Sequence, residues 1–432
     1  MFALQRAYRL LYNVNKPVYA GYYGTSKMRR QKATKMYHKE EGFMKKLDLF
    51  QTIMAGFSER SCISGVGCTP VRYLWTDAFA VCNFLELFRQ TGEQRYKEEA
   101  LMLIDQVHHV LGQHRSDDPR SGWISGLENR EGEAHPTIGG LRIGKKSNER
   151  KFNAPYNDRL EWEQDGQYFH YLTKWMHALN LVTQVTNDFR YNRWALELAK
   201  TAQNRFTYTT PTGEKRMHWK MSIDLSYPLV PSMGQHDALD GFITYLQLAR
   251  TASGDTQRPH ELYLEREIAE MAEMARTVNW ATDDPLGIGG LFSDAFMLTQ
   301  LIISNNKVYL TDMLLKLLTH AKRGIDAFMH TDTLKYPPHY RLAFRELGLS
   351  IGLHAVEKIE HLFSEHADSF VDRLLLQSQL KELNAYLPLS EIIENFWLDP
   401  ENQKSSTWSE HLDINSVMLA TSLDSDGYLM ME

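Results

Sequence analysis

The stretch WTDAFAVCNFLELFRQTGEQRYKEEALMLIDQVHHVL (residues 75–111) contains two different helices joined by a short turn. After one early acidic residue, Asp77, its first half is almost wholly apolar, which is typical of a helix buried on every side. Its second half has apolar residues on one face and charges opposite, which is typical of a helix that covers a core. The short turn QTGEQRY requires the second helix to run back antiparallel. The stretch therefore predicts a hairpin of one inner and one outer helix.

The inner-helix pattern, an acidic residue followed by an apolar run, occurs six times. The six runs span 75–88, 162–179, 234–249, 291–303, 341–356 and 410–423. Their acidic residues are Asp77, Asp165, Asp237, Asp294, Glu346 and Asp413. One-sided helices alternate with them, the first expected near 36–57. This alternation predicts an all-α (α/α)6 toroid in a single domain of residues 1–432, with a helical ring over about 36–423. An irregular helical domain or an open α-solenoid is the alternative.

Long connections are expected on one side of this ring. Residues 115–160, 207–233 and 387–408 each lead from an outer helix to the next inner helix. Loops of this length in a compact domain are usually functional. We therefore expect the main pocket at the N-terminal ends of the inner helices, among the acidic residues.

The turn and outer-helix start TGEQRYKEEA, after an inner helix with WTDAF, resembles the hairpin unit of the six-hairpin glycosidase superfamily. The N-acylglucosamine 2-epimerase-like sugar isomerases share that architecture. The resemblance extends over about 36–423 at the level of repeat shape. It implies the toroid and a carbohydrate substrate, and it leaves the reaction open.

Composition excludes several classes of function. Hydrophobic residues make up 43% and charged residues 24%, the balance of a globular protein. The net charge of −6 argues against a general nucleic-acid binder. No run approaches the ~20 apolar residues that cross a bilayer, so no membrane partner is expected. The N-terminus lacks the apolar region of a signal peptide, and three cysteines suit a reducing compartment, so we expect a cytoplasmic protein.

Cofactor signatures are missing as well. Cys62 and Cys68 lack a zinc-binding His pattern, and neither a P-loop nor a dinucleotide fingerprint occurs. We expect no metal and no other cofactor. The expected partner is a small carbohydrate, and the oligomeric state stays open.

Three stretches gather polar and aromatic residues at expected inner-helix starts. DRLEWEQDGQYFHYLTKW supplies Glu161, Trp162, Asp165, Tyr168 and His170; SMGQHDALDG supplies His236, Asp237 and Asp240; RLAFRELGLSIGLH supplies Arg341, Arg345 and Glu346. Aromatic rings beside acids suit a sugar, whose apolar face stacks while its hydroxyls need polar partners. Arginine binds carboxylate or phosphate, which allows an anionic sugar.

These stretches give a predicted site. Asp165 and Asp237 form the catalytic carboxylate pair, and His236 assists. The further catalytic acids, each of which also suits a helix cap, are Asp240, Glu346, Asp77 and Asp413. The substrate-binding residues are Trp162, Glu161, Tyr168, Arg341 and Arg345.

Three functions follow, in order of preference. The first is a glycoside hydrolase that uses paired carboxylates on a sugar or short oligosaccharide. The alternative is a sugar isomerase or epimerase that uses His236 or another rim histidine to move a proton. The second alternative is a sugar-binding toroid without catalysis.

Overall fold

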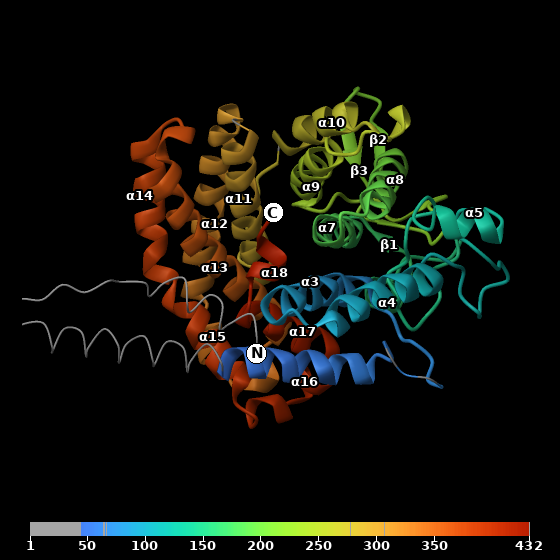
Figure 1. Cartoon of the computed structure of the whole chain (residues 1–432), viewed down its shortest axis with the longest axis horizontal. Helices are drawn as coiled ribbons and strands as arrows, with labels where there is room; N and C mark the ends of the chain where they lie inside the picture. The colour runs from blue at the N-terminus through green and yellow to red at the C-terminus, as the bar shows by residue number, and fades with distance from the viewer. Residues whose placement is uncertain (1–44, 64, 66, 277, 306, 432) are drawn as a thin grey trace, which may run out of the picture. The chain divides into compact units, whose positions relative to one another are not determined.

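The computed structural model describes residues 45–63, 65, 67–276, 278–305 and 307–431. Phe50–Glu432 form one compact unit (Figure 1), and of the segment before it only 45–49 are described. The helix expected near 36–57 is seen over 45–60, and its first part lies outside the described residues. The single domain over 1–432 therefore stays a prediction.

Six apolar helices form the inner ring of the larger unit. They are α3 (Leu74–Thr91), α7 (Phe169–Thr186), α9 (Asp237–Ala252), α11 (Pro285–Asn305), α13 (Ala343–His366) and α17 (Leu412–Leu423). Each packs against the next in this order, and α17 packs back against α3. There Asn83 Nδ2 donates to the carbonyl of Val417 at 3.2 Å, and the Thr421 hydroxyl donates to Asn83 Oδ1 at 3.0 Å. The ring is closed, which confirms the predicted (α/α)6 toroid.

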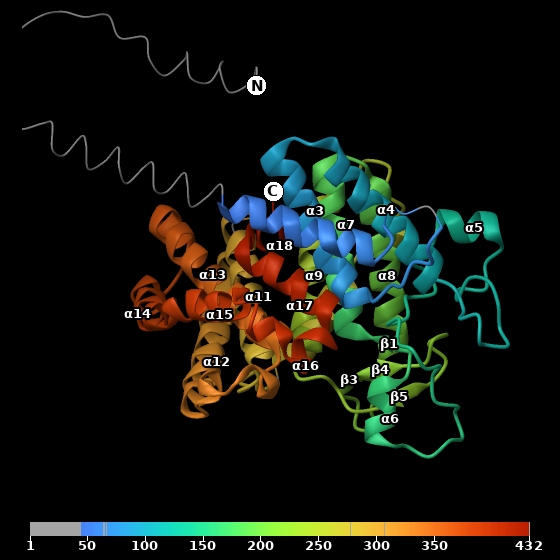
Figure 2. The same ribbon diagram turned by 90° about the horizontal axis from the view of Figure 1, so that it is seen from below.

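Outer helices cover this ring (Figure 2). Helix α4 (Gln94–Leu111) packs on α3, α8 (Phe189–Phe206) on α7, α10 (Glu265–Arg276) on α9 and α12 (Thr311–His330) on α11. The helical segment 50–60 joins them, because the Ser58 hydroxyl donates to Glu99 of α4 at 2.7 Å. Two inner helices, α3 and α7, end at residues in the left-handed conformation, Gly92 at φ 71° and Asn187 at φ 56°, and short turns follow them.

The fifth outer helix is broken in two. Helix α14 (Arg373–Leu383) is followed by α15 (Pro388–Leu398), and α15 packs on α13. Proline at the first position of α15 fits a helix start, because that position needs no N–H donor. The prediction of a long loop over 387–408 is wrong, since this segment contains α15 and α16 (Ser406–Ser409).

Two rim loops carry the short strands. Residues 112–168 contain α5 (Asn129–Ala134), α6 (Asp158–Glu163) and β1 (Gln167–Tyr168), and residues 207–230 contain β2 (Thr207–Thr209), β3 (Lys215–Met217), β4 (Lys220–Met221) and β5 (Pro228–Val230). Strands β1, β4 and β5 form a small antiparallel sheet, and β2 pairs with β3. Since α7 begins only at Phe169, after β1, the predicted inner run over 162–179 begins too early.

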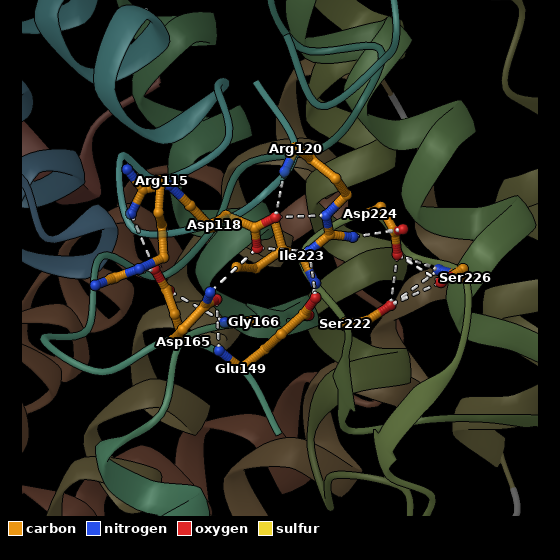
Figure 3. A network of polar contacts seen from close by, with 12 residues as sticks. Arg115, Asp118, Arg120, Glu149, Asp165, Gly166, Ser222, Ile223, Asp224 and Ser226 are labelled. Atoms are coloured by element: carbon orange, nitrogen blue, oxygen red, sulfur yellow. Dashed lines mark hydrogen bonds and ion pairs between the residues drawn. The ribbon is translucent and has the colours of Figure 1, made fainter. Parts of the chain in front are cut away.

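A network of ion pairs ties these two loops together (Figure 3). Arg120 contacts Asp118 at 2.8 Å and Glu149 at 2.6 Å in the first loop, and Asp224 at 2.7 Å in the second. Glu149 also accepts the backbone N–H of Ile223. The loops therefore hold each other in one arrangement over the N-terminal ends of the inner helices.

The other end of the ring is filled by α18 (Asp426–Leu429), which Figure 1 shows between α3 and α11. The Tyr428 ring stacks on Phe79 of α3 with 4.4 Å between centroids. Its carbonyl lies 2.9 Å from Nε2 of His177 on α7, and Gln300 of α11 donates to the carbonyl of Leu429 at 2.9 Å. The C-terminal ends of the inner helices are thus closed by the chain itself.

Two sequence expectations need correction. Among the described residues, α11 is long and apolar enough to cross a membrane, although most of it is buried against neighbouring helices, as in a core helix. Cys62 and Cys68 form a disulfide, whereas the cysteine count favoured a reducing compartment, where disulfides are rare. The cytoplasmic location stays a prediction.

Candidate functional site

The acidic residues of the six inner runs do not all lie at helix starts. Asp77, Asp237, Glu346 and Asp413 lie in the first turns of α3, α9, α13 and α17. Asp165 lies in the loop before β1, and Asp294 lies nine residues after the first residue of α11. The expectation that all six lie at the starts of inner helices is therefore wrong for Asp165 and Asp294.

Asp165 is fully buried, and its oxygens are occupied. Arg142 donates to it at 2.9 Å and Arg115 at 3.3 Å, while the N–H groups of Gly144 and Gly166 donate at 2.9 and 3.1 Å. All of these partners belong to the first rim loop. The geometry supports an anchor for that loop, and it does not place Asp165 beside Asp237.

We expect Asp165→Asn to lower the free energy of unfolding by about 3 kcal/mol or more, because it leaves two mostly buried guanidinium groups without a countercharge. Urea unfolding measures this loss. The matched control is Asp117→Asn, which removes the exposed partner of the same Arg115 and is expected to cost under about 1 kcal/mol. A stable Asp165→Asn variant without turnover would show that Asp165 is catalytic.

Two other predicted residues, Arg341 and Glu346, form an ion pair with each other. Arg341 donates to Glu346 at 2.8 and 2.6 Å, and the indole N–H of Trp397 on α15 donates to the same carboxylate at 2.8 Å. Both Arg341 and Glu346 are buried. This pair joins α13 to α15, so the contacts of Arg341, predicted to bind substrate, and of Glu346, predicted as a further catalytic acid, are those of a packing role.

Three more predicted acids have partners of their own. Asp77 accepts the N–H of Tyr73 at 2.9 Å, as a cap does, and burial raises its pKa to about 6 despite Arg72 at 3.6 Å. Asp413 pairs with Arg60 at 2.9 Å. Glu161 is buried between Arg150 at 3.0 Å and Lys220 at 2.9 Å. None of the three is free to act with Asp237 as a carboxylate pair.

Asp237 instead faces a histidine. Oδ1 of Asp237, the first residue of α9, lies 3.5 Å from Nδ1 of His170, the second residue of α7. Asp237 is buried, and its Oδ2 has no hydrogen-bond partner among the described residues. The His170 side chain is 24% exposed. The sequence analysis found His170 in a polar stretch but assigned it no role, because its spacing from other polar residues indicated none.

Aromatic side chains surround this pair. The ring of Trp75 on α3 lies 6.1 Å from His170 and 5.2 Å from Tyr171, and Tyr168 lies 5.2 Å from His170. Trp219, from the second loop, stacks on His170 at 6.4 Å. The predicted Trp162 lies outside this group, 53% exposed, with its ring 5.4 Å from Trp219. Trp75 and Trp219 were missed, and only Trp75 carried a signal, since it begins the apolar run of α3.

Arg345 approaches from the opposite side of the ring, because α13 lies three inner helices away from α7. Its NH1 donates to Asp284 at 2.6 Å. Burial raises the pKa of Tyr171, and the positive charge of Arg345 acts in the opposite direction. Its Nε is buried without a partner among the described residues, as is Nε1 of Trp75. We call Trp75, His170, Tyr171, Asp237 and Arg345 the rim cluster.

One turn further along the inner helices lies a second polar group. Lys174 of α7 contacts Asp240 of α9 at 3.2 Å, and Asp240 hydrogen bonds to Asp294 of α11. Burial, together with the charge of Asp240, raises the pKa of Asp294 well above its ordinary value. Because these residues join three successive inner helices, they point to the inside of the ring.

Gly290 marks open space above these carboxyl groups. It precedes Asp294 by four residues, so both lie on the same face of α11. A Cβ at Gly290 would meet no other atom within 4 Å. His170 precedes Lys174 by the same interval, so the open space lies at the level of the rim cluster.

His236, the predicted assisting residue, precedes α9. Its Nε2 lies 2.8 Å from the carbonyl of Trp280, which fixes the ring and leaves Nδ1 for other contacts. Among the described residues, no group of three or more His, Cys, Asp or Glu side chains is arranged to hold a metal ion.

Two described cavities lie at the other end of the inner helices. One, of about 40 Å3, is lined by residues that include Arg89, Gln184 and Asp426. The other, of about 330 Å3, is lined by residues that include Arg190 and Asp255. Both adjoin the short returns of the hairpins, at the end opposite to the predicted pocket, and neither tests the prediction that the main pocket opens at the N-terminal ends. The case for the rim cluster rests on its unpaired polar atoms and on the space at Gly290.

No family model matches the sequence, and no curated protein sequence matches it either. Among solved structures, the chain is similar to a cellobiose 2-epimerase from Spirochaeta thermophila DSM 6192, with 13% identity, a TM-score of 0.44 and coverage of 82% of this chain and 86% of that one. It is also similar to a D-mannose isomerase, with 13% identity, a TM-score of 0.46 and coverage of 87% and 96%.

Proposed function

We propose that the chain is a sugar isomerase or epimerase in which His170 moves a proton at the carbon beside a sugar carbonyl. The observation that carries the proposal is the His170–Asp237 pair, set among buried polar atoms of Trp75, Asp237 and Arg345 that have no partner among the described residues. Buried polar atoms are normally paired, so those left unpaired in a cluster are candidates for contacts with a polar ligand. A sugar supplies hydroxyl groups for such contacts.

The geometry assigns a role to each atom of the pair. The N–H at Nδ1 of His170 donates a hydrogen bond to Asp237, which keeps the proton on Nδ1 and leaves the lone pair on Nε2. That nitrogen takes the proton from the carbon beside the carbonyl of the open-chain sugar and leaves an enediolate. Return of the proton to the carbonyl carbon, with the hydroxyl proton moving between the two oxygens, gives the isomer. Return to the original carbon, after the enediolate has turned its other face toward Nε2, gives the epimer. The N–H group of Trp75 is a donor suited to an enediolate oxygen.

Glycoside hydrolysis has less support. It needs two carboxyl groups that flank the bond, about 5 to 10 Å apart, one protonated and one ionised. Asp165, Glu346, Asp77 and Asp413 are each engaged with an arginine. Asp240 and Asp294 are hydrogen bonded to each other, which is too close to hold a glycosidic bond between them. The geometry therefore favours the histidine chemistry over the carboxylate pair.

Exchange with solvent tests the reaction class. We expect the full chain, incubated with single aldoses and ketoses in D2O, to place deuterium at the carbon beside the carbonyl, as read by proton NMR. Reducing-sugar release from oligosaccharides without such exchange would overturn the proposal in favour of hydrolysis. Sugar binding measured by calorimetry, with neither reaction, would support a sugar-binding toroid.

A further inference from the structure

We propose that the substrate of this reaction carries an anionic group, a phosphate or a carboxylate, and that Lys145 and Arg345 bind it. This inference rests on the proposed function and names the substrate class of the same site. It is drawn from two cations placed on opposite sides of one group of aromatic residues at the N-terminal ends of the inner helices.

Two series of neighbouring residues lie between these two cations. On one side, Lys145 Nζ lies 5.2 Å from the centre of the Tyr73 ring, and the Tyr73 hydroxyl lies 2.6 Å from that of Tyr171. Arg345 is close enough to Tyr171 for its charge to oppose the pKa rise that burial causes there. Two residues therefore separate Lys145 from Arg345 on this side.

The second connection runs through α13 and α17. The Arg345 guanidinium lies 5.6 Å from the ring of Phe344, and that ring lies 5.8 Å from His411. Burial lowers the pKa of His411, and the charge of Lys145 acts in the same direction against the opposing effect of Glu410. Lys145, from the first rim loop, and Arg345, from α13, thus border the same group of residues, Tyr73, Tyr171, Phe344 and His411.

Lys145 is also held in place by its backbone. Arg115 donates to the carbonyl of Lys145 at 2.5 Å and to that of Lys146 at 2.8 Å, and Arg115 in turn contacts Asp165 at 3.3 Å. A buried ion-pair network therefore fixes where the side chain of Lys145 begins. A rigid position reduces the entropy that a lysine loses when it binds a ligand.

The charges of the two cations are unequally compensated. Lys145 has no ion pair with an acidic group among the described residues, and its ring contact leaves its three N–H donors free for an anion. Arg345 shares one N–H with Asp284, while its buried Nε has no partner among the described residues. An ammonium and a guanidinium with free donors form charge-assisted hydrogen bonds with phosphate or carboxylate.

The test compares substrates and variants. Deuterium exchange is measured for a neutral hexose, its 6-phosphate and its uronic acid, with wild type, Lys145→Met and Lys146→Met. Lys146 is the exposed neighbour, so it serves as the matched control. We expect one of the two anionic sugars to have a KM at least tenfold below that of the neutral sugar. Lys145→Met should raise this KM about tenfold to a hundredfold, and Lys146→Met should not change it.

The sugar that shows the low KM identifies the anion. Equal KM values for all three sugars, or equal effects of the two lysine variants, would overturn the anion site and leave the proposed reaction standing. Binding is also measured without turnover, as the shift in melting temperature caused by inorganic phosphate against chloride at equal ionic strength. A shift that Lys145→Met removes supports the site even if no sugar reacts, and no shift in the wild type contradicts it.

Discussion

His170→Gln is expected to lower the rate of deuterium exchange by about a hundredfold to ten-thousandfold, because it removes the proposed base. The fold should survive, since the side chain is partly exposed and its polar contact is with one carboxylate. Exchange rates by NMR and thermal unfolding, measured on the same preparation, separate the two effects. His361→Gln is the matched control, because that side chain is 71% exposed on α13 and should change neither quantity.

Two companion variants identify the base. Asp237→Asn keeps the size of the side chain but weakens its hold on Nδ1 of His170, so it should lower kcat and leave KM nearly unchanged. His236→Gln should have a smaller effect, because His236 is fixed to the carbonyl of Trp280. Full activity in His170→Gln together with its loss in His236→Gln would show that His236 is the base.

Gly290→Leu is expected to abolish turnover while the protein stays folded. The position faces open space beside the rim cluster, where a Cβ meets no atom within 4 Å, so a larger side chain would fill the volume that we assign to the sugar. Gly290→Ala is the control, since its methyl group is small and alanine is favoured over glycine in a helix by about 1 kcal/mol. We expect Gly290→Ala to be active and slightly more stable.

The readouts for Gly290 are the exchange rate, the KM and the melting temperature. A loss of turnover in Gly290→Leu at an unchanged melting temperature supports a substrate site inside the ring. Normal turnover in a stable Gly290→Leu variant would show that the sugar binds elsewhere, and the cavity lined by Arg190 and Asp255 would then be the next place to examine.

The fold was predictable because each hairpin repeats a local signal. Inner helices are apolar all round, outer helices are one-sided, and the returns at Gly92 and Asn187 use residues that tolerate the left-handed conformation. The helix that begins at Pro388 was missed, although proline at a helix start is a local signal of this kind.

The site was predictable only in part, because its chemistry depends on pairs from different helices. Asp237 was correctly placed at a helix start, but its partner His170 comes from α7 and shows no spacing relationship to it. Asp165 looked like the other acidic residues because it precedes an apolar run. Its place was decided by the pairing of β1 with β4, whose residues lie about fifty positions later in the chain. Arg341 and Glu346, five residues apart, likewise pair through a bend before α13 and not along a helix face.

The closure of the ring between α3 and α17 has a consequence for biosynthesis. Asn83 and Val417, which are hydrogen bonded there, are separated by 334 residues. At a synthesis rate of about 5–20 residues per second, α3 leaves the ribosome on the order of tens of seconds before its second neighbour exists. During that time one apolar face of α3 is not covered by its neighbour, and contacts of such long range form slowly. We therefore expect nascent chains that lack α17 to be aggregation-prone and to associate with chaperones, whereas chains that include α17 should be released.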